Sequence, residues 1–130
     1  IGDVHGCAGE LEALLVKLGY EFAWRRGADG AQVFVTPPPG RRAVFVGDLV
    51  DRGPRAPDVL RIVMGMVEAG TGFAVPGNHD VKFQRWLDGK DVKPTHGLDR
   101  TIASGQCRYA RVNGSLAGLR LVSHHLDGIG

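Results

Sequence analysis

The segment AVFVGDLVDRG occupies residues 43–53 and joins a short apolar run to an acidic turn. Four consecutive apolar residues are typical of a strand that is buried on both faces, as in a parallel sheet. The turn carries Asp48, Asp51 and Arg52 between two glycines. Because glycines permit tight turns and a close approach of the backbone to a ligand, the segment predicts a buried strand that ends at a functional loop.

Two further segments show the same arrangement. Residues 73–80 read FAVPGNHD, and residues 1–6 read IGDVHG, which would also follow a strand if residues preceded Ile1. Loops at the carboxyl ends of parallel strands open into one crevice, so the three turns are expected to converge. The polar residues that the two segments bring to this crevice are Asp3, His5, Asn78, His79 and Asp80.

The remaining pattern predicts an α/β fold. Apolar residues at helical spacing predict three helices, and short apolar or alternating runs predict four strands. The predicted helices are residues 10–18, 57–69 and 78–87. The predicted strands are residues 20–24, 31–35, 43–46 and 73–75, of which the first two form a hairpin that the prolines at 37–39 end. Residues 88–94 are expected to form a polar loop, and residues 98–123 are expected to be mainly helical.

Composition limits the function. The 130 residues are the usual size of one domain, and 43% are hydrophobic, enough for a core. The net charge of +2 argues against nucleic-acid binding by bulk charge alone. Cys7 and Cys107 do not suggest a disulfide framework, so a cytoplasmic location is expected. The sequence shows no signal peptide and no apolar run of about 18 residues, so no membrane partner is expected.

The residue types in the three turns suit a metal-dependent reaction at phosphorus. Asp3 and His5 are two apart in a segment expected to be extended, so both side chains would point the same way. Carboxylate, amide and imidazole ligands suit Mn, Fe, Ni, Zn or Mg, and a carboxylate that bridges two such ions is typical of two-metal hydrolysis. The alternative for any single turn is ordinary turn chemistry, with Asn78 as a helix cap.

The motifs GDVHG, GDLVDRG and GNHD, in this order, resemble the signature motifs of the calcineurin-like metallophosphoesterases, which include the serine/threonine phosphoprotein phosphatases. The resemblance covers residues 1–85. It implies the metallophosphoesterase-type α/β fold, a β-sandwich flanked by helices, here incomplete at both ends. It also implies two divalent metal ions, with manganese expected first and Ni, Fe, Zn or Mg as alternatives.

The resemblance also implies a role for each matching residue. Asp3 and His5 would bind the first metal ion, and Asp48 would bridge the two ions. Asn78 would bind the second ion and substrate phosphate, which Arg52 would also hold. His79 would be the general acid that protonates the leaving oxygen, oriented by Asp51, and Asp80 would support these ligands from behind.

A narrower resemblance concerns the sequence that connects the motifs. Residues 2–20, 47–70, 75–82 and 95–98 are similar to the phosphatase domain of bacterial polynucleotide kinase-phosphatases, which act in RNA repair. This resemblance implies RNA ends as the phosphorylated substrate, and kinase and ligase domains flanking this one in a longer chain.

One part of the family pattern is missing. The family completes its metal sites with two later histidines, in a His-Ala-Gly turn and a Gly-His turn, and neither context occurs here. Residues 1–130 are therefore expected to be the N-terminal part of a single domain, lacking its first strand and its C-terminal histidine motifs. His124 and His125 are expected to be structural or exposed rather than metal ligands. His96 is expected to lie in a solvated loop, with substrate contact as the alternative.

The function expected from these observations is a metal-dependent phosphoesterase that hydrolyses phosphomonoesters, RNA-end phosphates or cyclic phosphates among them. One alternative within the same superfamily is a serine/threonine protein phosphatase or a dinucleotide-polyphosphate hydrolase. The alternative from another class is an inactive fragment or a weak metal-binding module.

Overall fold

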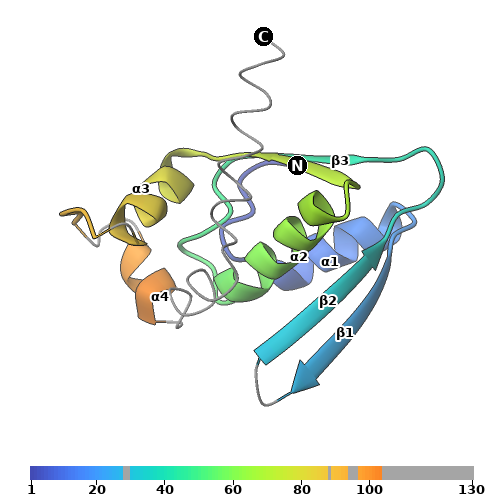
Figure 1. The fold of residues 1–130 in the computed structure, drawn as a ribbon, viewed down its shortest axis with the longest axis horizontal. Coiled ribbons are helices and arrows are strands. Elements are labelled where there is room, and N and C mark those ends of the chain that lie inside the picture. Colours follow the sequence, from blue (N-terminus) through green and yellow to red (C-terminus); the bar gives the residue numbers. More distant parts are fainter. Residues whose placement is uncertain (28–29, 88, 94–96, 104–130) are drawn as a thin grey trace, which may run out of the picture.

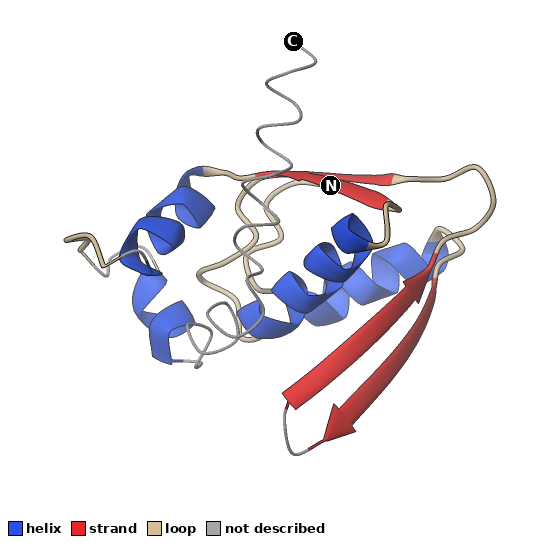
Figure 2. Cartoon of the chain, in the orientation of Figure 1, coloured by secondary structure: helices blue, strands red, loops and turns tan. Residues whose placement is uncertain are grey.

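A computed structural model describes residues 1–27, 30–87, 89–93 and 97–103 of the chain. The described part combines helices with strands, which confirms the predicted α/β class (Figure 1, Figure 2). Its elements are, in chain order, α1 (Ala8–Lys17), β1 (Glu21–Gly27), β2 (Gly30–Thr36), β3 (Ala43–Val46), α2 (Ala56–Glu68), β4 (Gly72–Val75), α3 (Asn78–Leu87) and α4 (Leu98–Ala103).

The predicted bounds agree best for β3 and α3, which have the bounds predicted over residues 43–46 and 78–87, and the helix predicted over residues 57–69 is α2, shifted by one residue. The expectation that residues 43–46 are buried on both faces was wrong, because Val44 and Val46 are exposed on the side of the sheet that faces away from the core. The hairpin is longer than predicted, because its ladder continues to the pair Gly27–Gly30. The end of β1 at that pair is exposed, so no apolar alternation marks it. Of the predicted helix over residues 98–123, α4 is the described part, and the remainder lies outside the described residues.

The parallel pair β3–β4 positions the three turns. Ala43 is paired with Gly72 and Val46 with Val75, so the two strands end together. The N-terminal segment lies on the other side of β3, because the amide of Val46 donates to the carbonyl of Ile1 at 2.8 Å. The amino group of Ile1 also donates to the carbonyl of Val44 at 2.7 Å. All three chain segments therefore turn away from the sheet at the same edge.

Helix α2 is the centre of the core. It contacts β4 of the parallel pair on one side and β2 of the hairpin on the other (Figure 1). Because both sides are covered, its buried residues form a face wider than a single stripe. Burying one such aliphatic side chain contributes about 1.5–3 kcal/mol. The buried apolar residues of α2 are Ala56, Val59, Leu60, Ile62, Val63, Met64 and Met66.

A buried carboxylate joins the hairpin to α2. Asp58 accepts hydrogen bonds from Arg55 at 2.9 Å and from Arg61 at 3.0 Å, both within one turn of the helix. Arg26 of β1 adds a longer ion pair at 3.8 Å. A charge taken out of water needs partners of opposite sign, and these arginines supply them.

The strands of the described residues make two separate two-stranded sheets, β1–β2 and β3–β4. Helix α2 packs against the second sheet, while the hairpin extends away from it (Figure 2). Within the described ranges, no helix has both the length and the apolar character needed to cross a membrane.

Candidate metal centre

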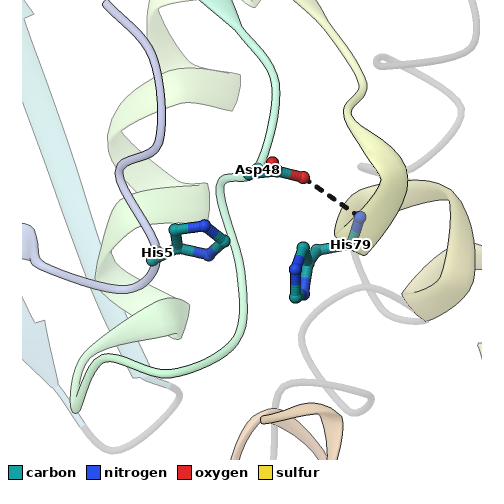
Figure 3. A group of neighbouring side chains, drawn as sticks. All are labelled: His5, Asp48 and His79. Atoms are coloured by element: carbon teal, nitrogen blue, oxygen red, sulfur yellow. Dashed lines mark hydrogen bonds between the residues drawn. The ribbon is translucent and has the colours of Figure 1, made fainter. Parts of the chain in front are cut away.

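The three predicted turns meet at the edge where β3 and β4 end. The amide of His5 donates to the carbonyl of Asp48 at 2.9 Å, and the next amide, of Gly6, donates to Leu49 at 2.9 Å. From the other side, the amide of His79 donates to the carboxylate of Asp48 at 3.1 Å. Asp48 therefore stands between the other two turns, as Figure 3 shows.

Three side chains from these turns form a group that can hold a metal ion. One donor atom each from His5, Asp48 and His79 lies within 4.8 Å of the others, and all three side chains are half-buried (Figure 3). The group combines a carboxylate with two imidazoles, a donor set that suits Mn, Fe, Ni or Zn. The structure thus brings together residues that are 74 positions apart in the chain.

The tautomer of His5 favours metal binding. Its Nδ1 lies 3.0 Å from the carbonyl oxygen of Val50, which can only accept a hydrogen bond. Nδ1 therefore carries a proton, and in the neutral ring Nε2 has a free lone pair. Metal-binding histidines commonly use such a carbonyl to fix the ring and its tautomer. The chemistry of this donor set therefore fits a divalent ion.

His79 is held by a buried carboxylate. Its Nδ1 lies 2.8 Å from Oδ2 of Asp51, a residue with no exposed surface. The other carboxylate oxygen accepts a hydrogen bond of 2.6 Å from the hydroxyl of Thr101, and that hydroxyl accepts one of 3.0 Å from the amide of Asp51. Asp51 thereby orients the imidazole and leaves Nε2 to exchange a proton with a ligand.

Asp80 holds the backbone of two turns together. One carboxylate oxygen accepts hydrogen bonds from the amides of Leu49 and Val50 at 2.8 and 3.2 Å, and the other accepts one from Gly77 at 2.9 Å. Burial raises the pKa of Asp80, the three amide hydrogen bonds oppose this effect without reversing it, and the nearby charge of Asp48 adds to it. The residue touches the backbone of the site rather than its ligand atoms.

The backbone at this edge adopts unusual conformations. Among the described residues, five other than glycine have positive φ, between 44° and 71°, and all five lie in the first two turns. Such conformations are costly for residues with a Cβ and cluster at functional sites. They are Asp3, His5, Asp48, Asp51 and Arg52. The expectation that Asp3 and His5 lie in an extended segment was therefore wrong, because this segment bends to pair with the turn after β3.

Two glycines allow the turns to approach one another. A Cβ added at Gly77 would lie 2.5 Å from Oδ1 of Asp48 and would also meet its backbone nitrogen. A Cβ added at Gly53 would overlap the carbonyl oxygen of His5. Only residues without side chains fit at these two contacts, so the motif glycines set the spacing of the site.

The remaining predicted site residues lie at its margin. Asp3, Arg52 and Asn78 are exposed, and the carboxylate of Asp3 lies outside the group formed by His5, Asp48 and His79. Asn78 is the first residue of α3, next to His79. His96, His124 and His125 lie outside the described residues.

Thr101 is the residue of this site that sequence reasoning missed. It is 1% exposed and comes from α4, 50 residues after the aspartate that it contacts. A single hydroxyl in a short helix has no periodic signature, so nothing in the sequence pattern connects it to Asp51. The structure alone reveals this contact.

Comparison with known families adds an independent observation to this geometry. The chain belongs to the calcineurin-like phosphoesterases, a family of hydrolases, and the family model matches residues 1–127. Among individual relatives, it is 48% identical over 103 residues to the bis(5'-nucleosyl)-tetraphosphatase PrpE [asymmetrical] of Halalkalibacterium halodurans. It is 46% identical over 103 residues to the protein of the same name from Bacillus subtilis.

The matched region is a larger share of this chain than of its relatives. It covers 79% of this chain and 39% of the length of each of these two relatives. The expected membership of the superfamily is confirmed. The narrower resemblance to polynucleotide kinase-phosphatases is not supported, because these relatives carry the name of tetraphosphatases.

Proposed function

We propose that the protein is a metal-dependent hydrolase that cleaves the phosphate chain of bis(5'-nucleosyl) tetraphosphates asymmetrically. The observation that carries the proposal is the group formed by His5, Asp48 and His79, with His79 held by the buried Asp51. The names of the relatives supply the substrate class. Of the functions expected from the sequence, this corresponds to the dinucleotide-polyphosphate alternative rather than to the phosphomonoesterase.

The donor set defines what the site can hold. In the proposal His5 and Asp48 would hold divalent metal ions together with Asp3 and Asn78, with Asp48 shared by the two other turns of the site. Such ions, when bound, activate water and neutralise charge on the phosphoryl oxygens. Manganese is the proposed ion, and Ni, Fe, Zn and Mg suit the same donors.

The other side chains act on the substrate. Arg52 is proposed to hold the reacting phosphoryl group, since its planar guanidinium matches two phosphate oxygens. The oxygen of water bonds to one phosphorus of the chain and loses a proton to the solvent, and the bond from that phosphorus to a bridging oxygen breaks. His79 is proposed to give its proton to that oxygen through Nε2, while Asp51 holds Nδ1. Asp80 keeps the two turns in register.

The products distinguish this function from its alternatives. Asymmetric cleavage of a four-phosphate chain leaves one phosphate on one nucleoside and three on the other, whereas symmetric cleavage leaves two on each. We therefore expect the full-length protein, with Mn²⁺, to convert bis(5'-adenosyl) tetraphosphate into equal amounts of AMP and ATP, measured by ion-exchange chromatography over a time course.

A matched variant and a second substrate complete the test. His79→Gln should lower the rate by about 100-fold or more, the scale of general acid catalysis. Formation of ADP alone would overturn the asymmetric assignment. Hydrolysis of 3'-phosphorylated RNA ends with no cleavage of the tetraphosphate would return the phosphomonoesterase as the better assignment.

A further inference from the structure

A groove lies beside the candidate metal centre, along one face of α3. It has a volume of about 380 Å³. One wall is formed by Asn78, Val81, Lys82 and Arg85 of α3, which lies at the left of Figure 1. The other wall is formed by Asp91, Val92 and Lys93 of the segment after the helix. None of these residues except Asn78 has a role in the proposed reaction.

The helix wall is a single face with one end at the metal centre. Asn78, Lys82 and Arg85 are spaced by four and three residues, and such positions lie above one another on one side of a helix. Seven residues advance about 10 Å along a helix axis. Asn78 adjoins His79, so the groove begins at the metal centre and leads away from it for about two helical turns.

The charges in the groove favour an anion. Lys82 and Arg85 line it from the helix, Lys93 lines it from the opposite wall, and Asp91 is the one acidic side chain among the lining residues. The lining therefore carries a net charge of +2. Arg85 and Lys93 are exposed and Lys82 is half-buried, so the positive charges reach the space between the walls.

We propose that this groove, which begins beside the candidate metal centre at Asn78, binds the part of the phosphate chain that extends beyond the reacting phosphate. The proposal rests on the function proposed above, because it assigns a place to the remaining charges of a polyphosphate substrate. A single phosphate would need a compact cluster of cations around one point. Lys82 and Arg85 lie about one and two helical turns beyond Asn78, so these cations lead away from the metal centre as the charges of a linear chain do.

Binding of inorganic tripolyphosphate tests the groove without turnover. We expect the full-length protein, freed of divalent metal, to bind tripolyphosphate in a calorimetric titration at low ionic strength, and to bind orthophosphate far more weakly. Lys82→Ala, Arg85→Ala and Lys93→Ala should each weaken the binding of tripolyphosphate about 10-fold, the scale of one charge-assisted hydrogen bond. Asp91→Asn should strengthen it, because it removes the negative charge.

The matched control is Lys90→Ala. Lys90 is an exposed lysine that precedes Asp91 and does not line the groove, so this variant should bind tripolyphosphate like the wild type. Thermal unfolding of each variant identifies any that fail to fold, and Lys82→Gln then replaces Lys82→Ala. If Lys90→Ala weakened binding as much as the groove variants, the effect would be one of net charge, and the groove assignment would be wrong.

The outcome is separable from that of the proposed function. If the tetraphosphate is not cleaved but tripolyphosphate binding depends on these three cations, the substrate assignment fails and the groove assignment stands. If the tetraphosphate is cleaved but the three variants bind tripolyphosphate like the wild type, the groove assignment is overturned and the proposed function stands.

Discussion

Asp51 has no exposed surface, and its carboxylate is hydrogen-bonded through both oxygens, to Thr101 and to His79. A buried carboxylate without such partners destabilises the fold, so both hydrogen bonds stabilise the buried position of Asp51. Thr101 is therefore a positioning residue. Its hydroxyl is hydrogen-bonded to the amide and the carboxylate of Asp51, and through Asp51 it acts on the orientation of His79.

Replacing Thr101 tests that chain of contacts. Thr101→Val has nearly the same shape but leaves the amide and one carboxylate oxygen of Asp51 without this partner. We expect the free energy of unfolding to fall by about 1–3 kcal/mol, measured by denaturant titration. We also expect kcat to fall more for a phosphate ester with an alkyl leaving group than for one with an activated aryl group, because only the alkoxide needs the proton from His79.

The conservative variant separates positioning from general damage. Thr101→Ser keeps the hydroxyl and should restore most of the rate on the alkyl ester. Equal losses on both esters would remove the proton-donor role of His79 and leave it as a metal or phosphate ligand, which its place beside His5 and Asp48 also allows. Unchanged kinetics in Thr101→Val would show that this hydroxyl does not orient the site.

The sequence predicted which residues meet at the site better than it predicted their backbone conformations and hydrogen bonds. Asp48 and His5 could be proposed as partners because both follow motif glycines at strand ends. The positive φ of Asp3 and His5 could not be predicted, because that conformation is imposed by hydrogen bonds to the turn after β3. The contact of Thr101 with Asp51 joins two residues whose positions share no period, so only the fold reveals it.

Among the elements, the junction of β4 with α3 has the largest effect on the site. The helix begins at Asn78, immediately before His79, so its position sets where the imidazole lies. Asp80 fixes the junction by accepting amide hydrogen bonds from Gly77 on its own segment and from Leu49 and Val50 after β3. The two strand ends are therefore coupled through one carboxylate.

Removing that carboxylate should uncouple the strand ends. Asp80→Ala leaves three amides without their acceptor, so we expect a loss of at least about 2 kcal/mol in the free energy of unfolding. We also expect a large loss of hydrolysis, because Asp48 and His79 are no longer held in register. Asp91→Ala removes an exposed carboxylate after the same helix and should change the free energy of unfolding by no more than about 0.5 kcal/mol. Equal stability of the two variants would contradict the role given to Asp80.

Among the elements, β3 was predicted more closely than the outer end of the hairpin. The apolar run of residues 43–46 gave β3 exactly, because a strand covered on its core side needs apolar residues there. The hairpin was predicted too short, since its backbone pairing continues through residues 25–27, which are exposed. Pairing in solvent leaves no mark on the hydrophobic pattern.

In the molecule as a whole, the candidate site lies at one edge of the core, where β3 and β4 end. The segment of residues 1–6, the turn after β3 and the start of α3 all leave the parallel pair at that edge, and the groove along α3 continues from it. The matched region corresponds to 39% of the length of each of the two PrpE relatives described above. That the chain is the N-terminal part of a single domain remains a prediction.

Asp48 and its neighbours are proposed to hold divalent metal ions that the reaction requires. The most direct test is the rate of cleavage of bis(5'-adenosyl) tetraphosphate by the full-length protein after treatment with a chelator, with Mn²⁺ then added back. Asp48→Asn is the matched variant, because its side-chain oxygen can still accept the hydrogen bond from His79 while the charge is lost. We expect no cleavage without metal, restored cleavage in the wild type, and a rate at least about 100-fold lower in Asp48→Asn, since loss of an outer partner of a metal ligand alone costs up to that factor. Full activity of the metal-free protein, or of Asp48→Asn, would contradict this proposal.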